Sequence, residues 1–188
     1  MKDTAKYYLE KYRKAKAERM QFEELYEECY DYALPQRAGF HYETKGQRRD
    51  DKIFDETAVV GVQEFASRLQ SGLVPNFARW ADFIAGSEMA EEDADEVNNE
   101  LDKVTEYIFE ILQNSNFSQE VHESFLDLAV GTACLIVEEG DAINPVRFNA
   151  IPLPQLVLES GPDDKIDHVY RQREVRCSDI TIIYPKAE

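Results

Sequence analysis

Apolar residues near the N-terminus recur at helical spacing. No proline or glycine interrupts residues 4–33, and the later apolar positions follow one another at steps of three and four. This pattern predicts an amphipathic helix that ends before Pro35. Four apolar positions are tyrosines with a polar hydroxyl, so we expect the stripe to pack at a rim or interface rather than in a dry core. The stripe comprises Tyr8, Tyr12, Ala15, Met20, Phe22, Leu25, Tyr26, Cys29, Tyr30 and Ala33.

Three further stretches also have a helical period. Asp55 is the predicted N-cap of a helix that Gly72 and Pro75 stop. The acidic run 88–96 suits the start of a helix that continues to residue 114, because negative charge complements the positive end of the helix dipole. Ser118 is the predicted N-cap of a helix that reaches Gly131. The expected buried faces are Val59, Val62, Phe65, Ala66, Leu69 and Leu73, then Val97, Leu101, Val104, Ile108, Ile111 and Leu112, then Val121, Phe125, Leu128 and Ala129.

The pattern becomes extended after Gly131, where apolar runs alternate with turn residues. A short aromatic stretch earlier in the chain also alternates. The predicted strands cover residues 80–85, 133–137, 146–151, 156–158 and 166–175, and a last helix begins at Ser178. The order predicts an α+β fold in which a long N-terminal helix and a helical layer precede a small, mostly antiparallel sheet.

Charge divides the 188 residues into two unequal parts. The chain carries 21 Lys and Arg against 38 Asp and Glu, a formal charge of −17. Residues 1–52 hold 12 basic and 11 acidic side chains, whereas residues 53–188 hold 9 and 27. We therefore expect an N-terminal helix and basic loop over 1–52, and an acidic α+β domain over 53–188 that is truncated at its C-terminal end. The net negative charge argues against a protein that binds nucleic acid tightly.

One basic island interrupts this acidity, in the segment 36–52 that lacks an apolar period. A solvated loop is the favoured interpretation, and contact with DNA or an acidic partner is the alternative. The island comprises Arg37, Lys45, Arg48, Arg49 and Lys52.

Motifs for catalysis or metal binding do not appear. His122-Glu123 resembles the start of a zinc-protease helix, but Leu126 stands where the second histidine belongs. The acids at 91–96 lack the spacing of a calcium loop. There is no glycine-rich phosphate loop, Gly-x-Ser-x-Gly or Cys-x-x-Cys, and the three cysteines are predicted to be reduced thiols. No uncharged run reaches membrane-spanning length. We expect no enzyme activity, cofactor, metal or membrane contact.

Several segments come in a familiar order. The long helix ends in EECYDYALP at 27–35, and the basic loop is followed by IFDETA at 53–58, ASRLQSGLVP at 66–75, RWADF at 79–83 and GTACLIV at 131–137. This ordered set resembles the head-to-tail connector, or portal, proteins of short-tailed bacteriophages. The residues that carry the resemblance are Pro35, Asp55, Thr57, Leu69, Gly72, Leu73, Pro75, Trp80 and Gly131.

The resemblance implies a structural subunit of a twelve-fold ring of identical chains at one capsid vertex. Double-stranded DNA would pass through the ring non-specifically during packaging and ejection, and the partners would be a packaging terminase, capsid proteins and tail adaptor proteins. The location would be the virion, and the host cytoplasm during assembly. Because portal proteins are much longer, this chain would correspond to the N-terminal part of the outer wing.

Two other functions remain open at this stage. A self-sufficient, monomeric acidic adaptor domain would use the tyrosine-rich helix as its binding face. A hydrolase that uses surface carboxylates and a divalent metal is the weakest alternative, because no ligand constellation supports it. For Gly72, Pro75 and Trp80 we favour a structural role, as a helix stop, a rigid turn and an aromatic anchor, over ligand contact.

Overall fold

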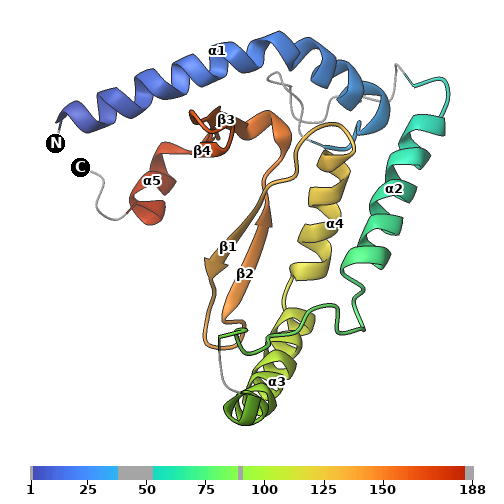
Figure 1. Cartoon of the computed structure of the whole chain (residues 1–188). Helices are drawn as coiled ribbons and strands as arrows, with labels where there is room; N and C mark the ends of the chain where they lie inside the picture. The colour runs from blue at the N-terminus through green and yellow to red at the C-terminus, as the bar shows by residue number, and fades with distance from the viewer. Residues whose placement is uncertain (1, 38–52, 89–90, 185–188) are drawn as a thin grey trace. The chain divides into compact units, whose positions relative to one another are not determined.

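The fold is α+β, as the sequence predicted, but its strands form two separate hairpins rather than one sheet. The computed structural model describes residues 2–37, 53–88 and 91–184. Its helices are α1 (Lys2–Ala33), α2 (Thr57–Leu73), α3 (Glu91–Asn114), α4 (Phe117–Leu128) and α5 (Cys177–Ile183). Its strands are β1 (Leu135–Glu139), β2 (Val146–Ala150), β3 (Leu156–Ser160) and β4 (Ile166–Arg171) (Figure 1).

The chain divides into two compact units. One combines Met1–Leu25 with Pro154–Glu188, and the other is Tyr26–Leu153. The continuous helix α1 therefore contributes its first part to one unit and its last part to the other. The domain boundary predicted at residue 52 lies outside the described residues, and the structure divides the chain at other points.

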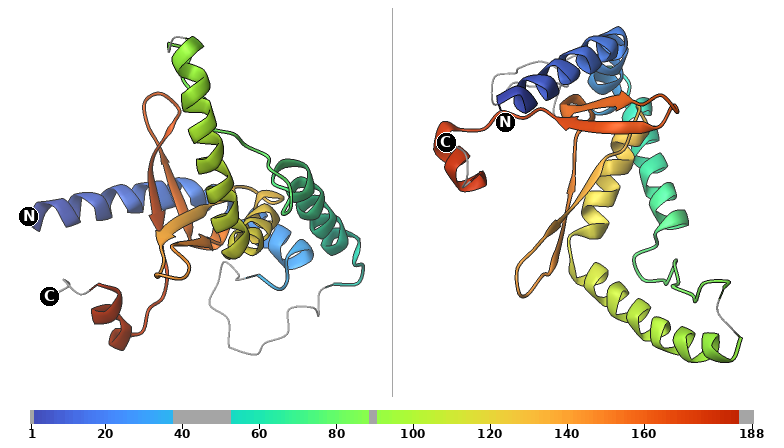
Figure 2. Two further views of the ribbon diagram at one scale, coloured as in Figure 1. Left: turned by 90° about the horizontal axis from the view of Figure 1, so that it is seen from below. Right: turned by 60° about the vertical axis from the view of Figure 1, so that its left-hand side comes forward.

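Helix α4 is the centre of the Tyr26–Leu153 unit. Helix α2 lies along one side of α4, and the antiparallel β1–β2 hairpin lies along another (Figures 1 and 2). These elements bury apolar side chains between them, as their amphipathic patterns require. The buried apolar residues of this unit are Tyr30, Leu34, Ala66, Val121, Leu126, Phe148, Ala150, Ile151 and Leu153.

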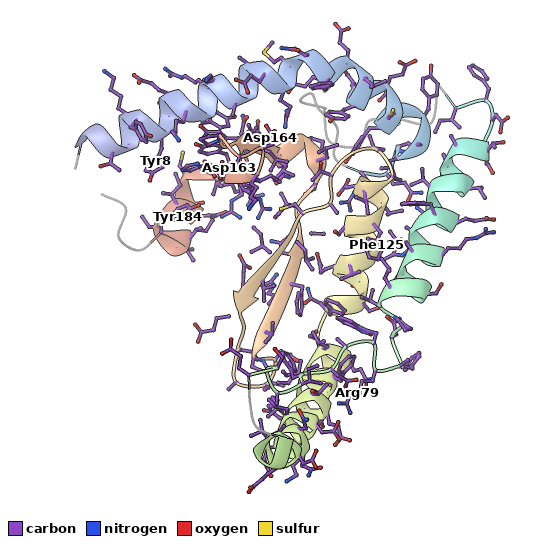
Figure 3. The ribbon with its side chains drawn as sticks, in the orientation of Figure 1. Tyr8, Arg79, Phe125, Asp163, Asp164 and Tyr184 are labelled. Carbon is purple, nitrogen blue, oxygen red and sulfur yellow. The ribbon has the colours of Figure 1, made fainter. Side chains whose placement is uncertain are left out.

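The other unit consists of the first part of α1, the antiparallel β3–β4 hairpin and α5. Ala15, Leu156 and Val157 are its buried apolar residues. The hairpin turns where the sequence predicted, at Gly161 and the acidic pair Asp163 and Asp164 (Figure 3). Asp164 has a positive φ of 56°, which aspartate tolerates better than most residues in turns.

Two helix starts differ from the predictions. Ser118 lies inside α4 instead of capping it, and its hydroxyl donates to Asn76 Oδ1 at 2.8 Å. Asn116 occupies the N-cap position of α4. Its side-chain amide bonds the backbone of Phe148 and forms no capping hydrogen bond with the helix. At α2 the cap position is Glu56, one residue after the predicted Asp55, although Asp55 Oδ1 accepts the Thr57 N–H at 2.7 Å.

The strand predicted at residues 80–85 is wrong. The segment forms neither a helix nor a strand, and no strand pairs with it among the described residues. Side chains of α3 take the place of a partner strand: Thr105 Oγ1 accepts the Phe83 N–H at 3.4 Å, and Asn98 Oδ1 accepts the Ala85 N–H at 2.7 Å. At the start of the segment Arg79 forms ion pairs with Asp82 and Asp102 (Figure 3).

The predicted buried faces of α3 and α4 are also partly wrong. Val104 of α3 is exposed, and the residue of α3 that is buried is Thr105. In α4 Leu128 is exposed, whereas Ser124 and Asp127 are buried. Helical periodicity identifies an apolar stripe, but hydrogen bonds to neighbouring elements can bury polar residues beside it.

Candidate functional site

A buried charged cluster joins the end of α1 to α4. Asp127 of α4 has no exposed surface, and its carboxylate accepts hydrogen bonds from the Tyr30 hydroxyl and from Arg37. Arg37 Nη1 also pairs with Glu123 Oε2 at 2.7 Å. Four residues after α1 ends, the chain is therefore fixed to α4 by a charge-assisted network.

Burial acts on the pKa values of three residues of this network, Asp127, Tyr30 and Arg37. Burial raises the pKa of the Asp127 carboxyl, although hydrogen bonds from Arg37 and Tyr30 act in the opposite direction. Burial also raises the pKa of the Tyr30 hydroxyl, and the neighbouring Asp127 charge raises it further. For Arg37 burial alone would lower the pKa, but the hydrogen bonds and charges of Asp127 and Glu123 raise it above its ordinary value. The cluster ties the chain after α1 to α4, because the single Arg37 guanidinium bonds two carboxylates of that helix.

The basic island is placed only in part. Arg37 lies in the buried cluster, with 11% of its side chain exposed, so it faces α4. Lys45, Arg48, Arg49 and Lys52 lie outside the described residues. For these four residues the favoured solvated loop and the alternative contact with DNA or an acidic partner both stay predictions.

An aromatic cleft of about 160 Å³ lies beside the turn that follows α2. Trp80 packs edge-on against Phe109 with 5.4 Å between ring centroids, and it stacks over Phe117 at 6.2 Å. Phe117 in turn contacts Phe148 of β2 at 4.9 Å. The cleft is lined by Val74, Pro75, Asn76, Phe77, Trp80, Phe109, Leu112, Gln113, Phe117 and Ser118. Such a lining suits an apolar side chain, and its one hydroxyl, that of Ser118, donates to Asn76.

A polar network behind this cleft joins α2 to α4, and the sequence did not single it out. Gln70 Nε2 donates to the Ser118 backbone oxygen at 2.8 Å, while Gln70 Oε1 bonds His122 Nδ1 at 3.0 Å. Asn76 accepts from the Ser118 hydroxyl. The sequence had marked Gln70 only as part of the 66–75 segment, Ser118 only as a helix cap and His122 only in an incomplete zinc motif. His122 is a half-buried bridging residue.

The residues that carry the family resemblance serve different local purposes. Gly131 is tightly packed, since a Cβ atom there would lie 3.1 Å from Leu153 Cδ2 and 3.3 Å from Tyr26 Cε1. By contrast, a Cβ at Gly72 would meet nothing within 4 Å. Pro75 and Trp80 line the aromatic cleft, and Asp55 bonds Thr57 at the start of α2. Pro35 and Leu69 are half-buried, and Leu73 is exposed.

Neither a metal cluster nor a membrane span is found in the part of the chain that the structure describes. No group of three or more His, Cys, Asp or Glu side chains there is arranged to hold a metal ion. No helix within residues 2–37, 53–88 and 91–184 is long and apolar enough to cross a membrane.

Comparison with known proteins agrees with the resemblance in the motifs. No curated protein matches the chain. The family model described as bacteriophage head to tail connecting protein matches residues 5–188, which is nearly the whole sequence. The chain therefore belongs to the family of bacteriophage head-to-tail connecting proteins.

Proposed function

We propose that this chain is the wing portion of a portal subunit that associates with copies of itself into a ring. Double-stranded DNA passes through that ring during packaging and ejection, and tail proteins attach to it. The role is structural and not enzymatic. The observation that carries the proposal is the family match over residues 5–188.

Exposed apolar side chains support a role in assembly. Among the described residues, 26 large apolar side chains are exposed while 12 apolar side chains are buried. Phe54 and Phe77 are exposed to 98% and 95%. Apolar surface on this scale favours contact with other chains, because water contact with it is unfavourable.

The charge distribution supports passage of DNA without a tight grip. Residues 53–188 hold 9 basic and 27 acidic side chains. A surface with this balance releases few counterions on meeting a duplex, so it binds phosphate weakly and lets the duplex slide. The proposed twelve-fold ring lies at the capsid vertex, forms in the host cytoplasm, and meets the packaging terminase, capsid proteins and tail adaptors.

Light scattering coupled to size-exclusion chromatography, over a range of protein concentration, tests this proposal. We expect large species, up to about twelve times the 21.7 kDa mass of one chain, and rings in negative-stain images of that peak. A sharp 21.7 kDa monomer at every concentration would contradict self-association and favour the adaptor alternative.

A further inference from the structure

The first part of α1 is rich in positive charge. Positions 4–19 hold six basic and two acidic side chains. Some of these bases serve their own unit, as when Lys11 pairs with Glu159 at 3.3 Å. Lys6 and Arg13 are exposed instead, and neither has an ion pair among the described residues. This part of α1 therefore keeps cations that its own unit does not use.

Exposed apolar side chains lie beside these two cations. Leu9 is 48% exposed and Met20 is 60% exposed. Positions 6, 9, 13 and 20 follow one another at steps of three, four and seven, so the four side chains share one side of the helix. The buried Ala15 lies on the other side. A rise of about 1.5 Å per residue makes this line about 21 Å long. We name Lys6, Leu9, Arg13 and Met20 the basic face.

Helix α3 has the opposite charge. Positions 94–114 hold six acidic side chains and one basic side chain, Lys103. One side of α3 contacts its own unit, where Thr105 accepts the Phe83 N–H and Phe109 packs against Trp80. In Figure 2 the helix extends beyond α4. The other side of α3 is left without a partner from the described part of the chain.

That other side carries acids around an exposed aromatic ring. Positions 96, 100, 107 and 110 follow one another at steps of four, seven and three, so they also share one side of a helix. Tyr107 is 61% exposed. Glu100 pairs with Lys103 at 2.7 Å, whereas Glu96 and Glu110 are exposed and have no ion pair within the described ranges. We name Glu96, Glu100, Tyr107 and Glu110 the acidic face, which is about 21 Å long as well.

We propose that the basic face of α1 in one copy packs against the acidic face of α3 in a second copy. The two faces are opposite in charge and similar in length, and each has exposed apolar side chains among its charges. Packing the two helices along these faces would bring cations next to carboxylates and remove Leu9, Met20 and Tyr107 from water. This inference rests on the proposed self-association and names its contact.

A second copy fits the basic face better than DNA does. A duplex on this face would leave Leu9 and Met20 against phosphate, and Glu10, which borders the face, would repel it. It would also leave the acidic face of α3 uncovered, whereas a second copy covers both faces with one contact. A contact between two different faces is head-to-tail, and such a contact generates a ring when its rotation closes.

Carbodiimide cross-linking of mixed isotopes tests the contact. Protein labelled with a heavy nitrogen isotope is mixed with unlabelled protein before assembly. The reagent joins a lysine amine to a carboxylate where the two are in ion-pair contact, and mass spectrometry identifies the joined peptides. We expect Lys6 to be joined to Glu96, Glu100 or Glu110, with as many mixed-isotope links as single-isotope links.

The outcomes of this experiment separate the contact from the ring. Links that always join peptides of the same isotope would overturn the inference, because the two faces would then meet within one chain. Rings without α1–α3 links would overturn the inference but leave the proposed function standing. Mixed-isotope links without rings would support the contact and contradict the ring. Monomers without mixed-isotope links would contradict both.

Reversing the charge of one face at a time gives a second test. The first variant carries Lys6→Glu and Arg13→Glu, and the second carries Glu96→Lys and Glu110→Lys. Each variant sets like charges against each other, so the concentration for half-assembly should rise about tenfold. The two variants are complementary to one another, so mixing them should restore assembly. Failure of two folded variants to assemble together would contradict the contact.

A matched control separates the face from net charge. Lys165→Glu with Arg173→Glu changes the net charge as much as the first variant does, at two exposed positions outside both faces. This control should assemble like the parent protein, and an equal weakening would overturn the assignment of the contact to α1. A first variant that assembles like the parent but loses binding to a short DNA duplex would overturn the inference in favour of DNA.

Discussion

Helix α1 is tied down by one carboxylate in each unit, and the two carboxylates behave in opposite ways. Asp127 of α4 accepts from Tyr30 near the end of α1 and has no exposed surface. Glu159 of β3 pairs with Lys11 at 3.3 Å and accepts from the Tyr170 hydroxyl at 2.8 Å, with 21% of its side chain exposed. Each carboxylate bonds one tyrosine hydroxyl and one cationic side chain. The difference between the two sites is therefore mainly one of burial.

The directions of the two pKa shifts follow from this difference. Burial penalises the charged form of Asp127 and raises its pKa despite the hydrogen bonds it receives. For Glu159 the hydrogen bond from Tyr170 is the largest influence, and with that from Lys11 it lowers the pKa. Similar partners therefore accompany a raised pKa at Asp127 and a lowered pKa at Glu159.

Removing Asp127 should have the largest effect on stability. Asp127→Ala leaves the buried Arg37 charge and the Tyr30 hydroxyl without their shared acceptor, which costs about 3–5 kcal/mol. Urea unfolding measures the loss, and hydrogen exchange should show faster exchange in α4. Asp95→Ala, which removes an exposed carboxylate of α3, should change stability by less than about 0.5 kcal/mol. Equal losses in both variants would refute the importance of burial here.

Removing Arg19 should have an intermediate effect confined to the other unit. Arg19 donates to the carbonyls of Pro154 and Leu156, so Arg19→Met removes charge-assisted bonds and costs about 1–3 kcal/mol. Hydrogen exchange should increase in β3 and β4. Arg13→Met on the same helix removes an exposed side chain and is the control. Unchanged exchange in the hairpin of the Arg19 variant would contradict this role.

Replacing Glu159 should have the smallest effect at neutral pH and a distinct pH dependence. The folded pKa of Glu159 lies below its ordinary 4.5, so its stabilisation is present above that value and is lost as pH falls through the folded pKa. The stability difference between the parent protein and Glu159→Gln should therefore shrink on acidification. A constant difference across that range would contradict the assignment.

The pH dependence of stability that Asp127 contributes should have the opposite sign to that of Glu159. Because the folded pKa of Asp127 lies above its ordinary 3.8, the folded protein binds this proton more readily than the unfolded chain does. Protonation of Asp127 therefore stabilises the folded protein fully below pH 3.8. This contribution is lost as the pH rises through the folded pKa of Asp127. The stability difference between the parent and Asp127→Asn should grow on acidification, which urea unfolding at several pH values would measure.

Local signals in the sequence determined most of the elements. An uninterrupted apolar period ending at Pro35 gave the long helix, because proline excludes the helical conformation for the residue before it. Alternating runs around Gly161 gave the β3–β4 hairpin. The ordered motifs also identified the family. These features depend on residues close together in the chain, so sequence alone carries them.

The tertiary structure alone decided which polar groups meet. Nothing local marks Asp127 as buried, since its partners Tyr30 and Arg37 lie about ninety residues away. The stretch 80–85 has strand-like alternation, yet Thr105 and Asn98 of α3 accept the Phe83 and Ala85 N–H groups, and no strand of the described residues pairs with it. Asn116 caps a strand edge instead of its own helix. A backbone or side-chain polar group bonds whichever partner the fold brings near, and long-range packing determines that partner.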